Sequence, residues 1–262
     1  MIPESYIRAW QAHAPWRDWV KVEQDLIVCR SVIAIFQHPL LCKHLIFRGG
    51  TALHKLFFRS ARRYSEDIDL VQIEVGPIGP VFDALRETLA PLLGKLQRKQ
   101  GPGVVTLTAR MISEIPPVTP MKLKVEINTR EHFTVLGIRK KSFVIESPWF
   151  TGLCEIPTFT LEELLASKLR ALYQRRKGRD LFDLWLGLTE GKADPRQIVD
   201  IFWRYMKNDR RRISREEFVQ NLAKKRLHPA FRTDLIDLLP VGQEYNFEDG
   251  FTVLEREILS RL

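Results

Sequence analysis

The 262-residue sequence has little cysteine and no long apolar run. Its three cysteines, Cys29, Cys42 and Cys154, are odd in number and none lies in a C-x-x-C pair, which argues against a disulfide framework. No apolar stretch approaches the roughly 20 residues that a helix needs to cross a bilayer. The start of the chain, with Glu4 and Arg8, has no apolar signal-peptide core. We therefore expect free thiols and a soluble cytoplasmic protein that does not enter a membrane.

The sequence also lacks internal repeats, low-complexity segments and an excess of acidic residues. Lysine and arginine number 41 against 32 aspartates and glutamates, which gives a net charge of +9 and a pI near 9.6. This charge favours a polyanionic partner, although other basic proteins share it. Hydrophobic residues make up 45% of the chain, enough for the core of one large domain or two small ones.

Residues 48–71 contain a pattern typical of an anion site. Gly49 and Gly50 follow the apolar run 45–47 and precede a segment of helical character, residues 51–58. A strand, a glycine turn and a helix N-terminus bind anions because backbone N–H groups are unpaired there. Thr51 is expected to cap this helix or to offer its hydroxyl to a phosphate.

Two acidic residues follow this turn. Asp67 and Asp69 alternate with Ile68 and Leu70, as in a half-buried strand, so both carboxylates lie on one face with Cα atoms about 7 Å apart. Hard divalent cations such as Mg²⁺ bind paired carboxylate oxygens. A phosphate site followed by an acidic pair predicts chemistry on a nucleoside triphosphate. The alternative is an ordinary glycine turn followed by an exposed acidic strand.

Residues 49–55 and 63–70 together resemble the signature of the AbiEii/AbiGii-type nucleotidyltransferase toxins, a family similar to the DNA polymerase β-like nucleotidyltransferases. The resemblance implies an α+β fold, with a mixed sheet in the N-terminal half and helices in the C-terminal half. It implies that Asp67 and Asp69 are catalytic and hold Mg²⁺. The residues expected to contact the nucleotide are Gly49, Gly50, Thr51, Lys55, Arg63, Ser65 and Asp180. Phosphorylation of Ser65 would add negative charge and repel the triphosphate, a further hypothesis for this site.

The segment 122–128 has the clearest strand pattern, with apolar side chains alternating with polar ones. In enzymes of the polymerase β type a third metal-binding carboxylate comes from a neighbouring strand, and the resemblance assigns that role to Glu126. The alternative is that Glu126 pairs with Lys122 or Lys124 on a wet face, which stabilises little.

Near Pro157 the pattern changes from alternating to helical. We therefore expect a catalytic domain over residues 1–157 and a helical domain over residues 158–262. In the helix that begins after Thr160, Lys168 falls in the middle of the apolar stripe, so it must reach an anion or extend past the core edge. This segment resembles the third motif of the family, which implies a catalytic Lys168 that contacts the triphosphate.

The segment after Gly178 resembles the fourth motif of the family. Gly178 is expected to end one helix and Asp180 to cap the next. Asp183 lies one turn further among apolar residues and needs a partner, which Lys168 or Arg179 could supply. We favour Asp183 over Asp180 for chemistry, as a group that orients or deprotonates the nucleophile.

Charged residues elsewhere are expected on the surface. Residues 16–37 predict an amphipathic helix that ends at Pro39, with Glu23 and Asp25 on its solvated side. Basic residues cluster beyond residue 200: Arg204, Lys207, Arg210, Arg211, Arg212, Arg215, Lys224, Lys225 and Arg226. They predict either a solvated surface or a stripe that binds an RNA backbone. Trp203 and Tyr205 beside them are expected in the core, with base stacking as the alternative.

Together with the resemblance, these patterns predict a Mg²⁺-dependent nucleotidyltransferase that transfers a nucleotide from an NTP to the 3′ end of tRNA and so blocks translation. The resemblance also implies a cognate antitoxin. One alternative is nucleotidylation of a protein side chain or an antibiotic. The other is a non-catalytic module that binds RNA or a nucleotide.

Overall fold

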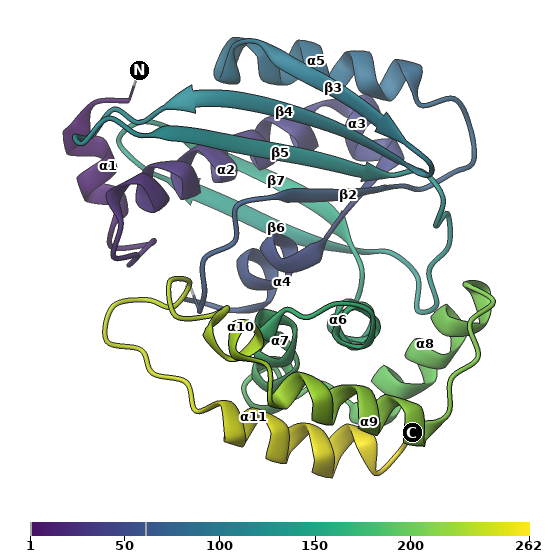
Figure 1. The fold of residues 1–262 in the computed structure, drawn as a ribbon. Coiled ribbons are helices and arrows are strands. Elements are labelled where there is room, and N and C mark those ends of the chain that lie inside the picture. The colour runs from purple at the N-terminus through teal and green to yellow at the C-terminus, as the bar shows by residue number, and fades with distance from the viewer. Residues whose placement is uncertain (1, 61) are drawn as a thin grey trace. The chain divides into compact units, whose positions relative to one another are not determined.

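The computed structural model describes residues 2–60 and 62–262 (Figure 1). The chain forms two units, residues 1–133 with 138–159 and residues 134–137 with 160–262. The first unit holds a β-sheet and the second is helical, which confirms the expected α+β class. The chain passes from the first unit to the second after Phe159, shortly after the boundary expected from the sequence. No helix in the described part of the chain is both long and apolar enough to cross a membrane.

The described residues of the first unit form a seven-stranded mixed sheet in the order β3-β4-β5-β2-β1-β7-β6 (Figure 1). The strands are β1 (Leu45–Arg48), β2 (Ile68–Gln72), β3 (Leu96–Gly101), β4 (Val104–Ile112), β5 (Pro120–Asn128), β6 (Arg139–Glu146) and β7 (Thr151–Thr158). β2 runs parallel to β5 and β1 parallel to β7, whereas the other neighbours are antiparallel. The alternating strand expected at residues 122–128 is confirmed as part of β5.

Helices of the first unit precede, connect and pack on these strands. They are α1 (Glu4–Trp10), α2 (Trp19–Gln37), α3 (Pro39–His44), α4 (Gly49–Phe57) and α5 (Gly79–Leu93). α2 packs on β5 and β7. It stops before His38, which is extended (φ −77°, ψ 120°), because the residue preceding a proline disfavours helical backbone. Pro39 thus opens α3 in addition to ending α2.

We expected Glu23 and Asp25 of α2 to be solvated, which is wrong, because both side chains are buried. The Glu23 carboxylate accepts hydrogen bonds from the Glu114 backbone N–H at 3.1 and 3.0 Å. Asp25 accepts one from Trp10 Nε1 at 2.9 Å. The sheet covers one side of α2, and α1 and α4 supply polar partners on the other, so the helix has no wet face at these positions.

A second difference concerns residues 94–101. The apolar pattern predicts helix over residues 81–97, with a kink or a break signalled by Pro91 and Gly94, but α5 ends at Leu93. Gly94 is its C-cap, with a φ of +72° that glycine adopts without strain. Residues Leu96–Gly101 then form the edge strand β3, paired with β4. The sequence LQRKQG has no apolar alternation because β3 is largely exposed on both faces, so its pattern carries no strand signal.

The second unit is built from helices whose connections are short except for the long segment 234–246 between the last two (Figure 1). They are α6 (Leu161–Gln174), α7 (Gly178–Thr189), α8 (Pro195–Asn208), α9 (Arg215–Arg226), α10 (Pro229–Thr233) and α11 (Phe247–Leu254), which continues into a π-helical turn, Glu255–Leu259. Thr160 caps α6 by accepting a hydrogen bond from the Glu163 backbone N–H. Tyr205 is buried as expected, whereas Trp203 is only partly buried.

Two expectations about the turn between α6 and α7 are wrong. α6 ends at Gln174, and Gly178 is the first residue of α7, not the end of α6. A Cβ at Gly178 would lie 2.2 Å from the Phe231 carbonyl oxygen, so glycine is required by close packing and not by a helix cap. Lys177 takes the cap position, and Asp180 therefore lies inside the first turn of α7.

Candidate functional site

The turn between β1 and α4 is closely packed against polar side chains. Gly49 has a φ of +80°, and a Cβ there would lie 2.1 Å from Asp69 Oδ2. A Cβ on Gly50 would lie 2.6 Å from an Arg63 guanidinium nitrogen and 3.0 Å from Ser65 Oγ. The N-cap residue of α4, Arg48, makes no side-chain capping hydrogen bond, and the first N–H groups of a helix have no partner within it and favour an anion. The glycines thus bring the helix N-terminus next to Asp69, Arg63 and Ser65.

Thr51 links this turn to the acidic strand. α4 begins at Gly49, so Thr51 lies within the first turn and the expectation that it caps the helix is wrong. Its buried hydroxyl lies 2.5 Å from the carbonyl oxygen of Asp67 and 2.9 Å from Ser65 Oγ. These contacts hold the residue before β2 against the start of α4.

Three carboxylates come from the neighbouring parallel strands β2 and β5. Asp69 is paired in register with Glu126, and paired residues of adjacent strands project from the same face of a sheet. Asp67 immediately precedes β2. Its Oδ2 lies 3.6 Å from Lys124 Nζ, which is also 3.2 Å from Glu126 Oε2. One ammonium therefore bridges Asp67 and Glu126. Both predicted environments of Glu126 are therefore present, because Glu126 shares a face with Asp69 and also forms an ion pair with a lysine.

The electrostatics reflect this accumulation of negative charge. Burial raises the pKa of the Asp67 carboxyl, the Lys124 ammonium opposes that rise, and the carboxylates of Glu66 and Glu126 add to it. Burial disfavours the charged form of Lys124, but Asp67 and Glu126 outweigh this and raise its pKa. The cluster attracts a cation, which at present is the lysine ammonium.

The donor set also fits a divalent metal ion. Asp67, Asp69 and Glu126 offer the carboxylate oxygens that Mg²⁺ prefers, and the bridging ammonium occupies a position where positive charge is stabilised. In the described residues no three acidic, histidine or cysteine side chains already stand in a coordinating arrangement. Binding of a metal would therefore require Lys124 to withdraw from between Asp67 and Glu126.

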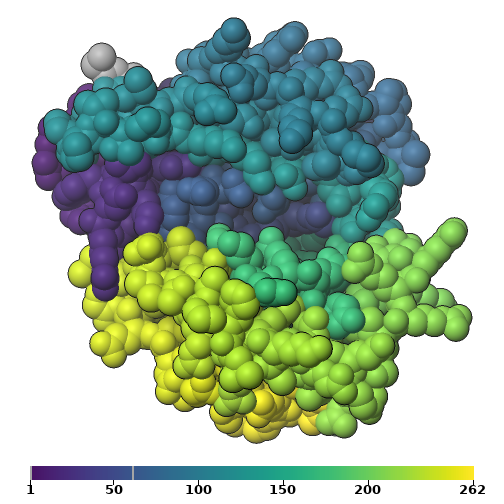
Figure 2. Space-filling view, in the orientation of Figure 1, coloured from purple at the N-terminus to yellow at the C-terminus, as the bar shows by residue number. Residues whose placement is uncertain are grey.

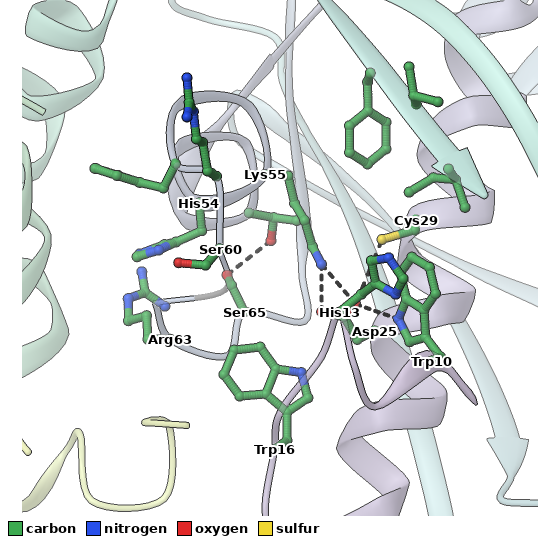
Figure 3. Close-up of a pocket in the computed structure, with 16 residues that line it drawn as sticks. Trp10, His13, Trp16, Asp25, Cys29, His54, Lys55, Ser60, Arg63 and Ser65 are labelled. Carbon is green, nitrogen blue, oxygen red and sulfur yellow. Dashed lines mark hydrogen bonds and ion pairs between the residues drawn. The ribbon is translucent and has the colours of Figure 1, made fainter. Parts of the chain in front are cut away.

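A cavity of roughly 150 Å³ borders the α4 turn (Figure 3). Its walls include Thr51, Arg63 and Ser65 from the site and Trp16 from the segment before α2. The Arg63 side chain is almost fully buried and donates to the Tyr64 carbonyl oxygen at 2.9 Å. Arg63 and Ser65, both expected to contact the nucleotide, thus line one cavity with the start of α4.

Lys55 points into this cavity but already has a counter-ion. Its ammonium lies 2.6 and 2.8 Å from the two carboxylate oxygens of Asp25 (Figure 3). Burial works against this charge, but Asp25 more than compensates and raises the pKa of Lys55. The role of Lys55 toward a phosphate stays a prediction. Sequence reasoning missed Asp25 as its partner, although an acidic residue within the mostly apolar segment 22–36 was a usable signal of a buried ion pair.

The second unit holds a buried ionic cluster. Lys168 Nζ lies 2.8 Å from Asp183 Oδ2 and 3.3 Å from Asp180 Oδ1. Asp180 and Asp183 are 0% exposed, and Arg175 binds Asp180 at 2.7 Å. The prediction that Lys168 supplies a partner for Asp183 is confirmed. The other possible partner, Arg179, binds Asp234 instead.

Comparison with known proteins connects these features to one family. The family model described as nucleotidyl transferase AbiEii toxin, type IV TA system, matches residues 32–253. In fold, the chain is similar to the MenT4 nucleotidyltransferase toxin of Mycobacterium tuberculosis H37Rv, with a TM-score of 0.67 and 17% identity over 98% of this chain and 90% of that chain. A proposed nucleotidyltransferase from H. pylori has a TM-score of 0.53 at 17% identity, over 88% of this chain and 90% of that chain. No curated protein matches the chain in sequence. Because the family model spans most of the chain, the protein belongs to the AbiEii family of nucleotidyltransferase toxins of type IV toxin–antitoxin systems.

Proposed function

We propose that the protein is a Mg²⁺-dependent enzyme that transfers a nucleotide from an NTP to the 3′ end of tRNA and thereby blocks translation. The observation that supports this most strongly is the packing of Gly49 against Asp69. It brings an uncapped helix N-terminus, suited to phosphates, next to carboxylates suited to a metal. Both groups are needed at one point when a triphosphate is attacked at its α-phosphorus.

The residues of the first unit divide between the phosphates and the metal. The N–H groups of Gly49, Gly50 and Thr51 bind the β- and γ-phosphates, and Arg63 neutralises part of their charge. Asp67, Asp69 and Glu126 hold Mg²⁺, which, when bound, would stabilise the negative charge that develops on the phosphate oxygens. Lys124, displaced from the carboxylates, remains near the site as a flexible cation.

The residues of the second unit act on charge and on the nucleophile. Lys168 provides a cation for the triphosphate, and its contacts with Asp180 and Asp183 hold the ammonium in position. The Asp183 carboxylate orients or deprotonates the acceptor hydroxyl. Asp180, bound by Arg175 and Lys168, positions Lys168.

The acceptor and the partners follow from charge and from the family. A net charge of +9 favours a polyanion such as tRNA over a neutral small molecule, and a tRNA acceptor places the protein in the cytoplasm. The type IV toxin–antitoxin family implies a cognate antitoxin and an NTP substrate.

In the test, purified protein is incubated with Mg²⁺ and each of the four α-labelled NTPs. Bulk tRNA, total protein and aminoglycosides are supplied as acceptors in separate reactions. We expect label on tRNA that is lost when the terminal 3′ hydroxyl is oxidised beforehand. Label only in protein or only on an aminoglycoside would overturn the tRNA acceptor. Absence of label in every reaction, with the antitoxin absent, would favour a non-catalytic module.

A further inference from the structure

A basic groove lies at the C-terminal end of α8. It has a volume of about 540 Å³ and is lined by Trp203, Met206 and Ile213 together with four cationic residues, Lys207 and residues 210–212. In Figure 2 the light-green surface of this part of the chain carries long side chains that extend into solvent. The four cations are exposed, whereas Trp203 is partly buried. We call this set of seven residues the α8 groove.

The cations of the α8 groove lack counter-ions. Within residues 2–60 and 62–262, none of the four forms an ion pair, whereas nearby cations do. Arg204 binds Asp200 at 3.1 Å, and Arg170 binds Asp209 at 3.2 Å. The neighbouring aspartates are therefore already paired with cations outside the groove. Four unneutralised charges in one concave surface favour an anion supplied by another molecule.

The backbone at Arg210 is unusual for a residue with a side chain. α8 ends at Asn208, and the Arg210 and Arg211 N–H groups bond back to the Lys207 and Met206 carbonyl oxygens, each at 3.0 Å. This helix ending requires a left-handed residue and strongly favours glycine there. Arg210 adopts it with a φ of 55°, which is unfavourable for a residue with a Cβ. Glycine at this position would relieve the backbone and remove the charge together.

Trp203 gives the groove an aromatic surface. Its ring packs against Phe202 at a centroid distance of 5.0 Å and an angle of 58°, and the partly buried side chain lines the groove. Stacking on an aromatic ring needs a base whose face is free, so it selects single-stranded over paired nucleic acid. Cations that follow a backbone and an aromatic ring beside them are the usual elements of such sites.

We propose that the α8 groove binds a single-stranded segment of nucleic acid, with phosphates on Lys207 and residues 210–212 and one base on Trp203. The identification of that segment as the 3′ single strand of tRNA rests on the function proposed above. The groove is an acceptor-binding surface and takes no part in the chemistry.

The experiment measures binding of a labelled single-stranded oligoribonucleotide to the full-length protein by fluorescence anisotropy, without NTP or Mg²⁺. Arg210→Gly is expected to raise Tm, because glycine suits the left-handed backbone, and to weaken binding. Loss of one phosphate contact lowers affinity roughly fivefold at 0.1 M salt and makes the dependence on salt less steep. Trp203→Leu is expected to lower affinity roughly tenfold.

Lys192→Gly provides a matched control. Lys192 is also exposed and left-handed, with a φ of 52°, and it does not line the α8 groove. This variant loses the same charge and gains the same backbone relief, so Tm should rise while RNA binding stays at the level of the parent. Equal affinity of the parent, Arg210→Gly and Lys192→Gly would overturn the proposal. So would an unchanged affinity in Trp203→Leu, which would leave only a general anion site.

These outcomes are separable from those of the proposed function. Groove-dependent RNA binding without any nucleotide transfer would refute the enzyme and leave the groove intact. Transfer to tRNA with unchanged binding in Arg210→Gly and Trp203→Leu would refute the groove and leave the enzyme intact.

Discussion

Among single residues, Lys124 shows most clearly that the acidic cluster stabilises a cation. Its ammonium lies within 3.6 Å of Asp67 and 3.2 Å of Glu126, and both contacts are partly solvent-exposed, so they add little stability by themselves. Their significance is that a cation is stable between these carboxylates. A lysine at this point would compete with Mg²⁺ for the same oxygens. Once displaced, its ammonium could instead form an ion pair with a bound phosphate.

We predict that Lys124→Met strengthens the binding of Mg²⁺ in the absence of nucleotide, because the competing ammonium is removed. The rise in Tm produced by millimolar Mg²⁺ should be larger in the variant than in the parent, since ligand binding to the folded state raises stability. The matched control is Lys122→Met on the same face of β5, an exposed lysine that has no contact with the acidic cluster. An equal Mg²⁺ effect in all three proteins would show that Lys124 and the metal do not share a site.

For individual residues, the sequence predicted the burial of charged side chains least well. Strand alternation predicted that Asp67 and Asp69 share one face, because side-chain direction in a strand follows directly from sequence position. Only the resemblance joined Glu126 to them, and Glu126 does pair in register with Asp69. Glu23 and Asp25 lie on a helix, where exposure depends on what packs against each side. That information lies in α1, α4 and the loop around Glu114, which are distant in sequence, so the helical pattern alone could not supply it.

Among the elements, the start of α4 depends on two glycines for different reasons. Gly49 needs left-handed backbone and leaves no space beside Asp69, whereas Gly50 has ordinary helical backbone and faces the ends of the Arg63 and Ser65 side chains. A flexible side chain can move away from an added methyl group at small cost, but backbone strain cannot be relieved in this way.

We therefore predict that Gly49→Ala destabilises the protein by about 2 kcal/mol or more, since it combines backbone strain with displacement of Asp69. Gly50→Ala should cost under about 1 kcal/mol and yet weaken NTP binding, because the methyl group displaces Arg63 from the turn. Chemical denaturation and titration with NTP would measure the two effects. Equal destabilisation by both substitutions would contradict this account of the turn.

The end of α6 is held by a lysine from another helix. Lys225 in α9 donates to the carbonyl oxygens of Leu172 and Tyr173, the latter at 2.7 Å, which have no partner within α6. Burial lowers the pKa of Lys225 from 10.5 to about 8, with a small contribution from Arg176 and opposition from Asp180. The lysine thus releases its proton more easily in the folded protein than in the unfolded chain.

This gives a pH-dependent prediction with a definite sign. Between pH 8 and 10.5 the unfolded chain still holds the proton that the folded protein has released, so this lysine makes the free energy of unfolding rise with pH. Below about pH 8 both states are protonated and its contribution is constant. The unfolding free energy of the parent minus that of Lys225→Met should therefore increase from pH 8 to pH 10. Exposed Lys224→Met serves as the control, and a difference that is flat with pH for Lys225→Met would contradict the prediction.

The boundaries of elements were predictable where the sequence contains a local signal. Thr160 and the apolar stripe located α6, and Gly94 was available as the end of α5. Gly178 misled because a glycine after a helix usually marks its C-cap, whereas here it allows close contact with Phe231. Edge strand β3 gave no signal because both of its faces are polar and exposed.

For the whole molecule, two short motifs were enough to predict the fold class and the family. Residues 49–55 and 63–70 carry the contacts between the glycine turn and the acidic strand, and both motifs lie within the residues that the family model matches. The net charge of +9 predicted a polyanionic partner, and the basic cluster beyond residue 200 gave only an approximate position for it. Net charge has no location until the chain folds, and only the structure shows which cations lack counter-ions.

Whether Asp69 serves metal-dependent transfer is tested most directly by comparing nucleotide transfer to tRNA by the parent, Asp69→Asn and Glu66→Gln over a range of Mg²⁺ concentrations. Glu66 is the exposed acidic neighbour of the pair, so its substitution removes a similar charge without removing a metal ligand. We predict that Asp69→Asn folds like the parent and loses transfer by at least about a thousandfold at every Mg²⁺ concentration, because a ligand of the metal is gone. Glu66→Gln should keep transfer close to that of the parent. Transfer by Asp69→Asn at the level of the parent would contradict the account.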